Sequence, residues 1–199
     1  MKTLKNTFFP ILSLLLSIAG LIVLIFFSAQ IGIPIYIVSF AIFGSGLIIL
    51  YAVFTALHIL KGTKYEGIMR KIHNASSYIL ISATYTPIYL AVFPTGWGWG
   101  MFGVTWGLTL IGIFLYCFKN VPSLAHTIIF ILIDWIIVVA FYPLYASLPF
   151  MAIKILTLGS ALYTMSVIMD KHEHTYLSQI NMLLGSLVHI YFMFTYILI

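Results

Sequence analysis

The sequence predicts an all-α, polytopic membrane protein, a bundle of seven transmembrane helices forming a single domain over residues 1–199. Three observations predict this class. Hydrophobic residues make up 63% of the chain, charged residues only 7%, and the mean hydropathy is +1.16, whereas a soluble domain of this size carries about a quarter charged residues. The apolar residues form seven runs, each near the roughly 20 residues that a helix needs to cross a bilayer. The basic residues are concentrated in alternate loops between those runs.

The apolar runs give the boundaries of the expected spans. The first run is too long for the 7–15-residue core of a signal peptide, so we interpret it as an uncleaved span. Gly32 and Pro34 break the helix after it, and the second span is long enough to tilt in the bilayer. The seven spans are expected at about residues 8–28, 35–60, 72–93, 101–118, 123–142, 150–169 and 176–198.

Connections between the later spans are predicted from polar, proline and glycine residues. Two uncharged turns are expected at 94–100 and 143–149, and the tryptophans of the first suit a membrane interface. Three connections carry the charge and are expected at 61–71, 119–122 and 170–174.

The loop charges predict the orientation. Every Lys and Arg except Lys154 lies in the amino-terminal segment or in the second, fourth or sixth loop. By the positive-inside rule, the amino terminus is expected in the cytoplasm and the carboxyl terminus outside. The net charge of +5 is therefore a topology signal rather than a nucleic-acid footprint, and membrane lipids are the expected partners. The single cysteine, Cys117, cannot form an internal disulfide.

In this topology, imidazole groups gather at the cytoplasmic ends of the spans. His58 ends the second span and His73 opens the third. Imidazole is the commonest zinc ligand, and three protein ligands plus a water make a catalytic site. One interpretation is a cytoplasm-facing metal pocket of His58, His73 and one further histidine. The alternative is that these side chains, like His126, are hydrated interfacial or helix-capping groups.

Other polar residues extend this candidate pocket along the bundle. Thr175 and Gln179 begin the seventh span, while Asp134 and His189 lie deeper, near the middle of the fifth and seventh spans. A carboxyl group at that depth is expected to be protonated unless it is paired. Pairing of Asp134 with His189 or with Lys154 stays open, as does a neutral acid hydrogen-bonded within the bundle.

Several strings, in their order and spacing, resemble those of the haemolysin III-type membrane proteins, in the wider group that includes the progestin and adipoQ receptors. The resemblance extends from the second span to the end of the chain and implies seven helices with a cytoplasmic amino terminus. The matching strings include Thr55-Ala56-Leu57-His58, Ala83-Thr84-Tyr85-Thr86-Pro87, the run from Trp99 to Leu108, and Leu184-Gly185-Ser186-Leu187-Val188-His189.

The resemblance also implies a zinc pocket near the cytoplasmic face. In the family, its ligands are a histidine late in the second span and two histidines opening the seventh, supported by a serine and an aspartate. Only His58 matches as a ligand. The serine position falls at Phe54, the aspartate at His73, and the late histidines at Thr175 and Gln179. Most of the zinc positions are therefore substituted, so no cofactor is expected, with zinc held through His58 and His73 as the alternative.

Two function hypotheses follow from this resemblance. The leading one is a non-enzymatic haemolysin III-like protein that lyses membranes or forms a pore. The alternative is a zinc-dependent hydrolase of a lipid amide or ester at the cytoplasmic face, with a zinc-bound water as nucleophile and His58 as one ligand. A third reading, a receptor or channel, comes from family analogy alone. The sequence leaves the oligomeric state open.

Overall fold

The computed structural model describes residues 2–93, 95–118, 122–171 and 175–198, and nearly all of them are helical. Two short segments are π-helical turns (η1 and η3) and one is a 3₁₀ helix (η2). The elements are α1 (Lys2–Ile31), α2 (Pro34–Ile59), α3 (Glu66–Pro87), η1 (Ile88–Val92), α4 (Thr95–Phe118), α5 (Ser123–Asp134), η2 (Trp135–Ala140), α6 (Phe141–Ser147), α7 (Phe150–Lys171), α8 (Thr175–Met193) and η3 (Phe194–Leu198).

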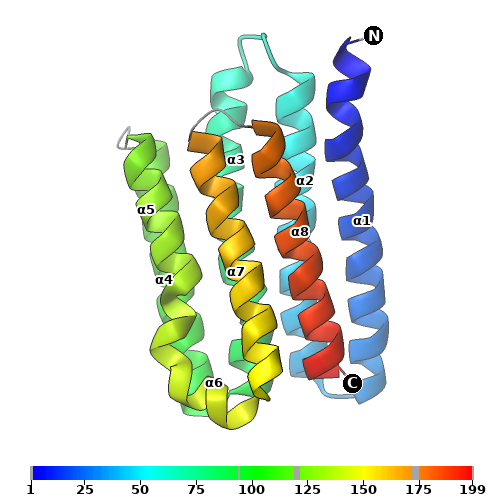
Figure 1. Ribbon diagram of the computed structural model, residues 1–199, viewed down its shortest axis with the longest axis vertical. Coiled ribbons are helices and arrows are strands. Elements are labelled where there is room, and N and C mark those ends of the chain that lie inside the picture. Colours follow the sequence, from blue (N-terminus) through cyan, green and yellow to red (C-terminus); the bar gives the residue numbers. More distant parts are fainter. Residues whose placement is uncertain (1, 94, 119–121, 172–174, 199) are drawn as a thin grey trace.

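The long helices lie side by side as a single bundle, with the two chain ends at opposite ends of it (Figure 1). The most extensive contacts join α1 to α2, α2 to α3, and α7 to α8. The loop between α2 and α3 lies at the same end as the amino terminus, and α6 lies at the opposite end. We call the first of these the amino-terminal end of the bundle.

Glycine and proline set the boundaries of α2. Gly32 has a φ of +72°, a left-handed conformation that glycine adopts without strain. Ile33 is extended, and Pro34 is the first residue of α2, where its missing N–H leaves no hydrogen bond unmade. Gly62, with a φ of +81°, turns the chain after α2 towards α3.

Within the described residues, six helices are long and apolar enough to cross a membrane: Phe8–Ile31, Pro34–Ile59, Gly96–Phe118, Leu124–Ser147, Phe150–Lys171 and Tyr176–Leu198. Helix α3 differs from them because its first two turns are polar and its later turns are rich in Ser, Thr and Tyr. From Asn74 to Pro87 nearly every residue of α3 is buried, whereas α1 and α4 lie mostly exposed. Helix α3 is thus covered by its neighbours along this stretch, and its surface there need not be apolar.

Two predicted turns are wrong in extent, because helix replaces most of each. Residues 95–100 are the start of α4, where Gly98 allows close packing: a Cβ there would lie 2.0 Å from the Tyr89 carbonyl oxygen. Residues 143–147 belong to α6, which follows the 3₁₀ segment η2. Pro143 falls in the first turn of α6, where a proline is tolerated. Asp170 and Lys171, expected in a loop, end α7.

The centre of the bundle is aromatic and partly polar. Its largest fully buried side chains include four tyrosines, Tyr78, Tyr85, Tyr89 and Tyr163. Buried hydroxyl groups need hydrogen-bond partners. The partners of these four tyrosines include Asp134, His126, Ser186 and Thr105.

Candidate functional site

The first polar group lies at the amino-terminal end of the bundle, where the last turn of α2 meets the second turn of α8. His58 Nδ1 donates to the carbonyl of Phe54 at 3.0 Å, so His58 Nε2 is the acceptor nitrogen of the ring. The Gln179 amide Nε2 donates to His58 Nε2 at 3.1 Å. Two residues that the sequence placed in one pocket, 121 positions apart, are therefore in direct contact.

His73, on the second turn of α3, also packs against Phe54. The Phe54 ring centroid lies 4.5 Å from that of His58 and 5.2 Å from that of His73. His73 Nδ1 lies 3.3 Å from Asn74 Oδ1, to which it donates. The two imidazoles that the metal hypothesis paired therefore pack against the same phenyl ring.

Two small cavities flank these imidazoles. One, of about 50 Å³, is lined in part by His58, His73, Lys61, Arg70 and Asp170. The other, of about 20 Å³, lies deeper and is lined in part by His73, Asp170 and Gln179. Asp170, from the last turn of α7, lines both, although the sequence gave no reason to single it out.

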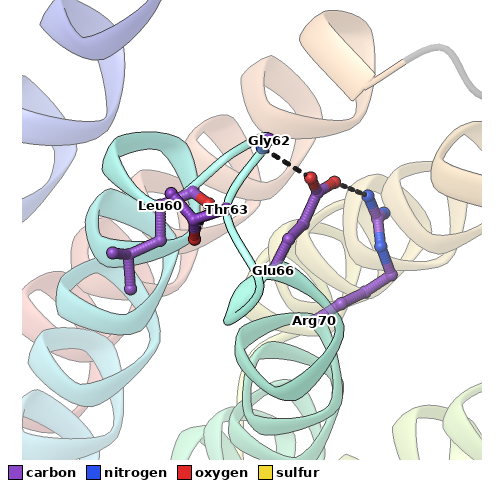
Figure 2. A network of polar contacts seen from close by, with 5 residues as sticks. All are labelled: Leu60, Gly62, Thr63, Glu66 and Arg70. Atoms are coloured by element: carbon purple, nitrogen blue, oxygen red, sulfur yellow. Dashed lines mark hydrogen bonds and ion pairs between the residues drawn. The ribbon is translucent and has the colours of Figure 1, made fainter.

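The loop between α2 and α3 contributes Lys61 to the lining of the larger cavity. Figure 2 shows the polar contacts that hold this loop. Glu66 accepts a hydrogen bond from the Gly62 backbone N–H at 2.7 Å and another from Arg70 Nη2 at 3.1 Å. The Gly62 N–H, followed by Arg70, lowers the pKa of the Glu66 carboxyl below its ordinary value. Thr63 Oγ1 donates to the Leu60 carbonyl at 2.6 Å and tightens the turn.

The residues described here do not fit a three-ligand zinc site. Among them, no three His, Cys, Asp or Glu side chains cluster closely enough to hold a metal ion. The His58 Nε2 lone pair, which would bind a metal, accepts the Gln179 amide hydrogen instead. Thr175 opens α8, and the two histidines of the segment before it, His172 and His174, lie outside the described residues.

His126 is held away from this pocket, between α3, α4 and α5. Its Nδ1 is hydrogen-bonded to the Tyr78 hydroxyl, and its ring packs 5.0 Å from that of Tyr116. The Tyr116 hydroxyl in turn accepts a hydrogen bond from Asn74 Nδ2. His126 is therefore held by Tyr78 and packs on Tyr116, and it is not among the residues that line the cavity shared by His58 and His73.

The second polar group lies deeper and is centred on Asp134, which is fully buried. The Tyr85 hydroxyl donates to Asp134 Oδ1 at 2.9 Å, and the Thr164 hydroxyl donates to Asp134 Oδ2 at 3.0 Å. Tyr85 also bonds Ser160 at 2.6 Å, and Trp135 Nε1 donates to Thr164 at 2.9 Å. Residues of four elements, α3, α5, η2 and α7, meet around this carboxyl group.

His189 lies beside this cluster without a hydrogen bond to Asp134. Its Nδ1 donates to the Gly185 carbonyl at 2.8 Å, and its ring stacks on Tyr163 with centroids 4.8 Å apart. Its Nε2 has no hydrogen-bond partner in the part of the chain that the structure describes. Lys154 lies over the Phe150 ring instead, with its Nζ 4.8 Å from the centroid. Neither suggested partner of Asp134 is therefore bonded to it; hydroxyl groups take that place.

Sequence reasoning missed the hydroxyl partners because their roles depend on tertiary contacts. Tyr85 stood out only as part of a matching string, and Ser160 and Thr164 were not singled out as partners. One signal was present: Ser160 and Thr164 are four residues apart, and so share a face of α7. Which helix faces them could not be read from that spacing.

Comparisons with known proteins agree with the resemblance seen in the strings. The sequence model of the family described as haemolysin-III related matches residues 3–196. A protein named hemolysin-3 homolog from Bacillus subtilis (strain 168) is 36% identical over 158 residues, which cover 79% of this chain and 74% of that relative. Hemolysin-3 of Bacillus cereus is 32% identical over 155 residues, covering 77% of this chain and 71% of that protein. No solved structure gives a significant match. This chain, which the family model matches along almost its whole length and whose described residues form six apolar membrane-length helices, belongs to the haemolysin III-related family.

Proposed function

We propose that this protein is a seven-helix, non-enzymatic membrane protein that permeabilises lipid bilayers. The proposal that the protein is not an enzyme is supported by the hydrogen bond from Gln179 to His58 Nε2. This bond places a neutral amide, a poor zinc ligand, where the resemblance implies an imidazole. The lytic half is supported by two relatives that carry the name hemolysin-3.

The seventh crossing is proposed for α3 together with η1. This pair lies alongside the six apolar helices, between the α2–α3 loop at one end and the start of α4 at the other (Figure 1). Its polar residues are supported by neighbouring helices, as expected for polar side chains within a membrane. Seven crossings, with the basic loops inside, put the amino terminus in the cytoplasm and the carboxyl terminus outside.

Permeabilisation by this fold requires more than one chain or a distorted bilayer. The centre of the described bundle is filled by buried Tyr, Phe and Leu side chains. The exposed faces carry many large apolar side chains, such as Leu110, Phe118 and Val139, which suit contact with lipid. The proposed partners are therefore membrane lipids and further copies of the chain, not nucleic acid.

Release of a trapped dye tests the proposal. Purified protein is reconstituted into liposomes that contain a self-quenched dye, with protein-free liposomes and a His58→Ala variant in parallel. The native protein and the variant are expected to release dye alike, and a strong zinc chelator is expected to change neither. Absence of release at high protein-to-lipid ratio would contradict the lytic function.

One observation favours a second candidate, a zinc-dependent hydrolase of a lipid amide or ester at the cytoplasmic face. His58, His73 and Asp170 all line the larger cavity, and each is a residue type that binds zinc. Their present spacing does not form a metal site, so zinc would have to draw the three side chains together. Metal analysis of the native protein and of His58→Ala separates the two candidates. About one zinc per chain, lost in the variant, would favour the hydrolase; a small fraction of one zinc in both would exclude it.

A further inference from the structure

We propose that the cavity beside His58 and His73 binds a phosphate-type oxyanion, either the headgroup of an anionic phospholipid or free phosphate. This site is separate from the permeabilising activity and does not depend on it. The argument rests on the charges around the cavity, its size and its position at the end of the apolar helices.

Two cations line the cavity. Arg70 uses Nη2 to bond Glu66, and a guanidinium has five N–H groups, so further donors are left for a ligand. Lys61 makes no hydrogen bond or ion pair with any residue that the structure describes, and it brings three more donors. Arginine and lysine together are the usual ligands of phosphate oxygens.

The cavity also carries two carboxylates. Glu66 is held by the Gly62 N–H and by Arg70 (Figure 2), and Asp170 is the second carboxylate of the lining. The α2–α3 loop and the start of α3 carry four cations, Lys61, Lys64, Arg70 and Lys71, against the carboxylates of Glu66 and Asp170. The summed charge around the cavity is therefore positive, which favours an anion over a cation.

The size of the cavity selects the ligand. A cavity needs about 10–15 Å³ to hold one water molecule. At about 50 Å³, this one has room for roughly four waters or for one tetrahedral oxyanion. An acyl chain or a complete lipid is too large, so only the phosphate of a lipid would enter.

The position of the cavity makes lipid a source of that phosphate. Beside it, at the end of α2 and the start of α3, Ile59 and Ile68 expose 64% and 57% of their surface. Apolar side chains at a basic helix end suit the border between acyl chains and headgroups. Basic pockets between helices on the cytoplasmic side are known to take up anionic headgroups.

The test is a binding titration in detergent micelles, with bound lipid counted by native mass spectrometry. Native protein is titrated with phosphatidylglycerol, with phosphatidylcholine and, as competitor, with inorganic phosphate. Lys61→Gln and Arg70→Gln each remove one donor from the cavity. Lys64→Gln is the matched control, since it loses the same charge from the same loop but Lys64 does not line the cavity.

Lys61→Gln and Arg70→Gln are each expected to weaken phosphatidylglycerol binding about tenfold or more, the effect of losing a charged hydrogen bond. Lys64→Gln should weaken it less than about fivefold. Glu66→Gln should strengthen binding, because it removes a negative charge and frees Arg70. Phosphate that displaces the lipid supports the site, and saturable phosphate binding without lipid binding identifies free phosphate as the source.

Three outcomes would overturn the proposal. The first is equal losses in Lys61→Gln and Lys64→Gln, which would mean diffuse attraction to the loop. The second is no preference for phosphatidylglycerol over phosphatidylcholine together with no phosphate binding. The third is weaker binding in Glu66→Gln, which would mean that the loop fold alone matters. Circular dichroism of each variant shows that it has the native helix content.

Discussion

At the scale of single residues, the notable feature is a carboxylic acid buried deep in an apolar bundle. An isolated carboxylate there is costly, because it loses its hydration. Asp134 is accommodated by two hydroxyl donors, Tyr85 and Thr164, which approach its two oxygens from α3 and α7. The carboxyl group therefore links three helices that are far apart in the sequence.

The Tyr85 hydroxyl is expected to matter for stability. Tyr85→Phe removes the donor to Asp134 and the partner of Ser160 while keeping the ring. Leaving a buried polar group without its partner costs about 1–3 kcal/mol. We expect the free energy of unfolding, measured by denaturant titration in detergent, to fall by that amount.

Tyr145→Phe is the matched control for this change. Tyr145 is 60% exposed, and its stacking on Phe141 needs only the ring. Its free energy of unfolding should stay close to that of the native protein. Equal values for the two variants would show that the Asp134 contact adds nothing to stability.

Gly159 gives a second prediction at this scale. It packs against His189 so closely that a Cβ would lie 2.4 Å from the ring Cε1 and 2.7 Å from Nδ1. The His189 ring is itself stacked on Tyr163, so it has little room to move. Gly159→Ala should therefore destabilise the protein by about 1–3 kcal/mol, the usual cost of overpacking.

Gly103→Ala serves as the comparison. Gly103 lies on α4, where an added Cβ would meet no atom within 4 Å. Alanine also has the higher helix propensity, so the change should be neutral or stabilising by up to about 1 kcal/mol. Thermal unfolding of both variants checks the pair, and a stable Gly159→Ala protein would contradict the close packing of His189.

At the scale of elements, α3 shows where sequence patterns predict well and where they do not. Apolar runs locate helices that face lipid, and six of the seven expected spans correspond to such helices. Only the later turns of α3 were predicted as a span. Because neighbouring helices bury this helix, its residues do not have to be apolar, and hydropathy is a poor guide to its start. Glycine at 95–100 and proline at 143–147 were wrongly taken as signs of turns. Gly98 allows close packing within a helix, and Pro143 lies in the first turn of α6.

The loop between α2 and α3 carries a pH prediction. The pKa of Glu66 is lowered, first by the Gly62 N–H and then by Arg70. Its contribution to the loop is therefore present above the ordinary glutamate pKa of about 4.3 and is lost as pH falls through the lower, folded value. Hydrogen exchange of the Gly62 amide, corrected for the intrinsic rate, should show protection that decreases over this acidic range.

Glu66→Gln provides the control for the loop. Its amide oxygen accepts from Gly62 but does not titrate, so protection of the Gly62 amide should stay constant over the same pH range. Protection in the native protein that does not change with pH would mean that the carboxylate is not the acceptor.

At the scale of the whole molecule, the helical membrane class followed from composition, and the positions of most helices followed from the apolar runs. His58 contacts Gln179, which the resemblance places at one of the family's late histidine positions. The deep cluster could not be predicted in the same way. Periodicity gives the face of one helix, whereas the meeting of Tyr85, Asp134 and Thr164 depends on which helices are neighbours.

The number of crossings and the orientation can be tested together by labelling single cysteines. The background is Cys117→Ser, and one cysteine is added in turn at Ile33, Thr63 or Trp97, each in an exposed position. These sites lie between α1 and α2, between α2 and α3, and in the first turn of α4. A membrane-impermeant maleimide is applied to intact cells and to permeabilised cells.

If α3 crosses the bilayer and the basic loops face the cytoplasm, Ile33→Cys and Trp97→Cys should be labelled in intact cells. Thr63→Cys should be labelled only after permeabilisation. Without a crossing by α3, Trp97→Cys would behave like Thr63→Cys, because both would lie on the same side. With the opposite orientation, all three patterns would be exchanged. The Trp97 site therefore decides whether a buried, polar helix counts as the seventh span.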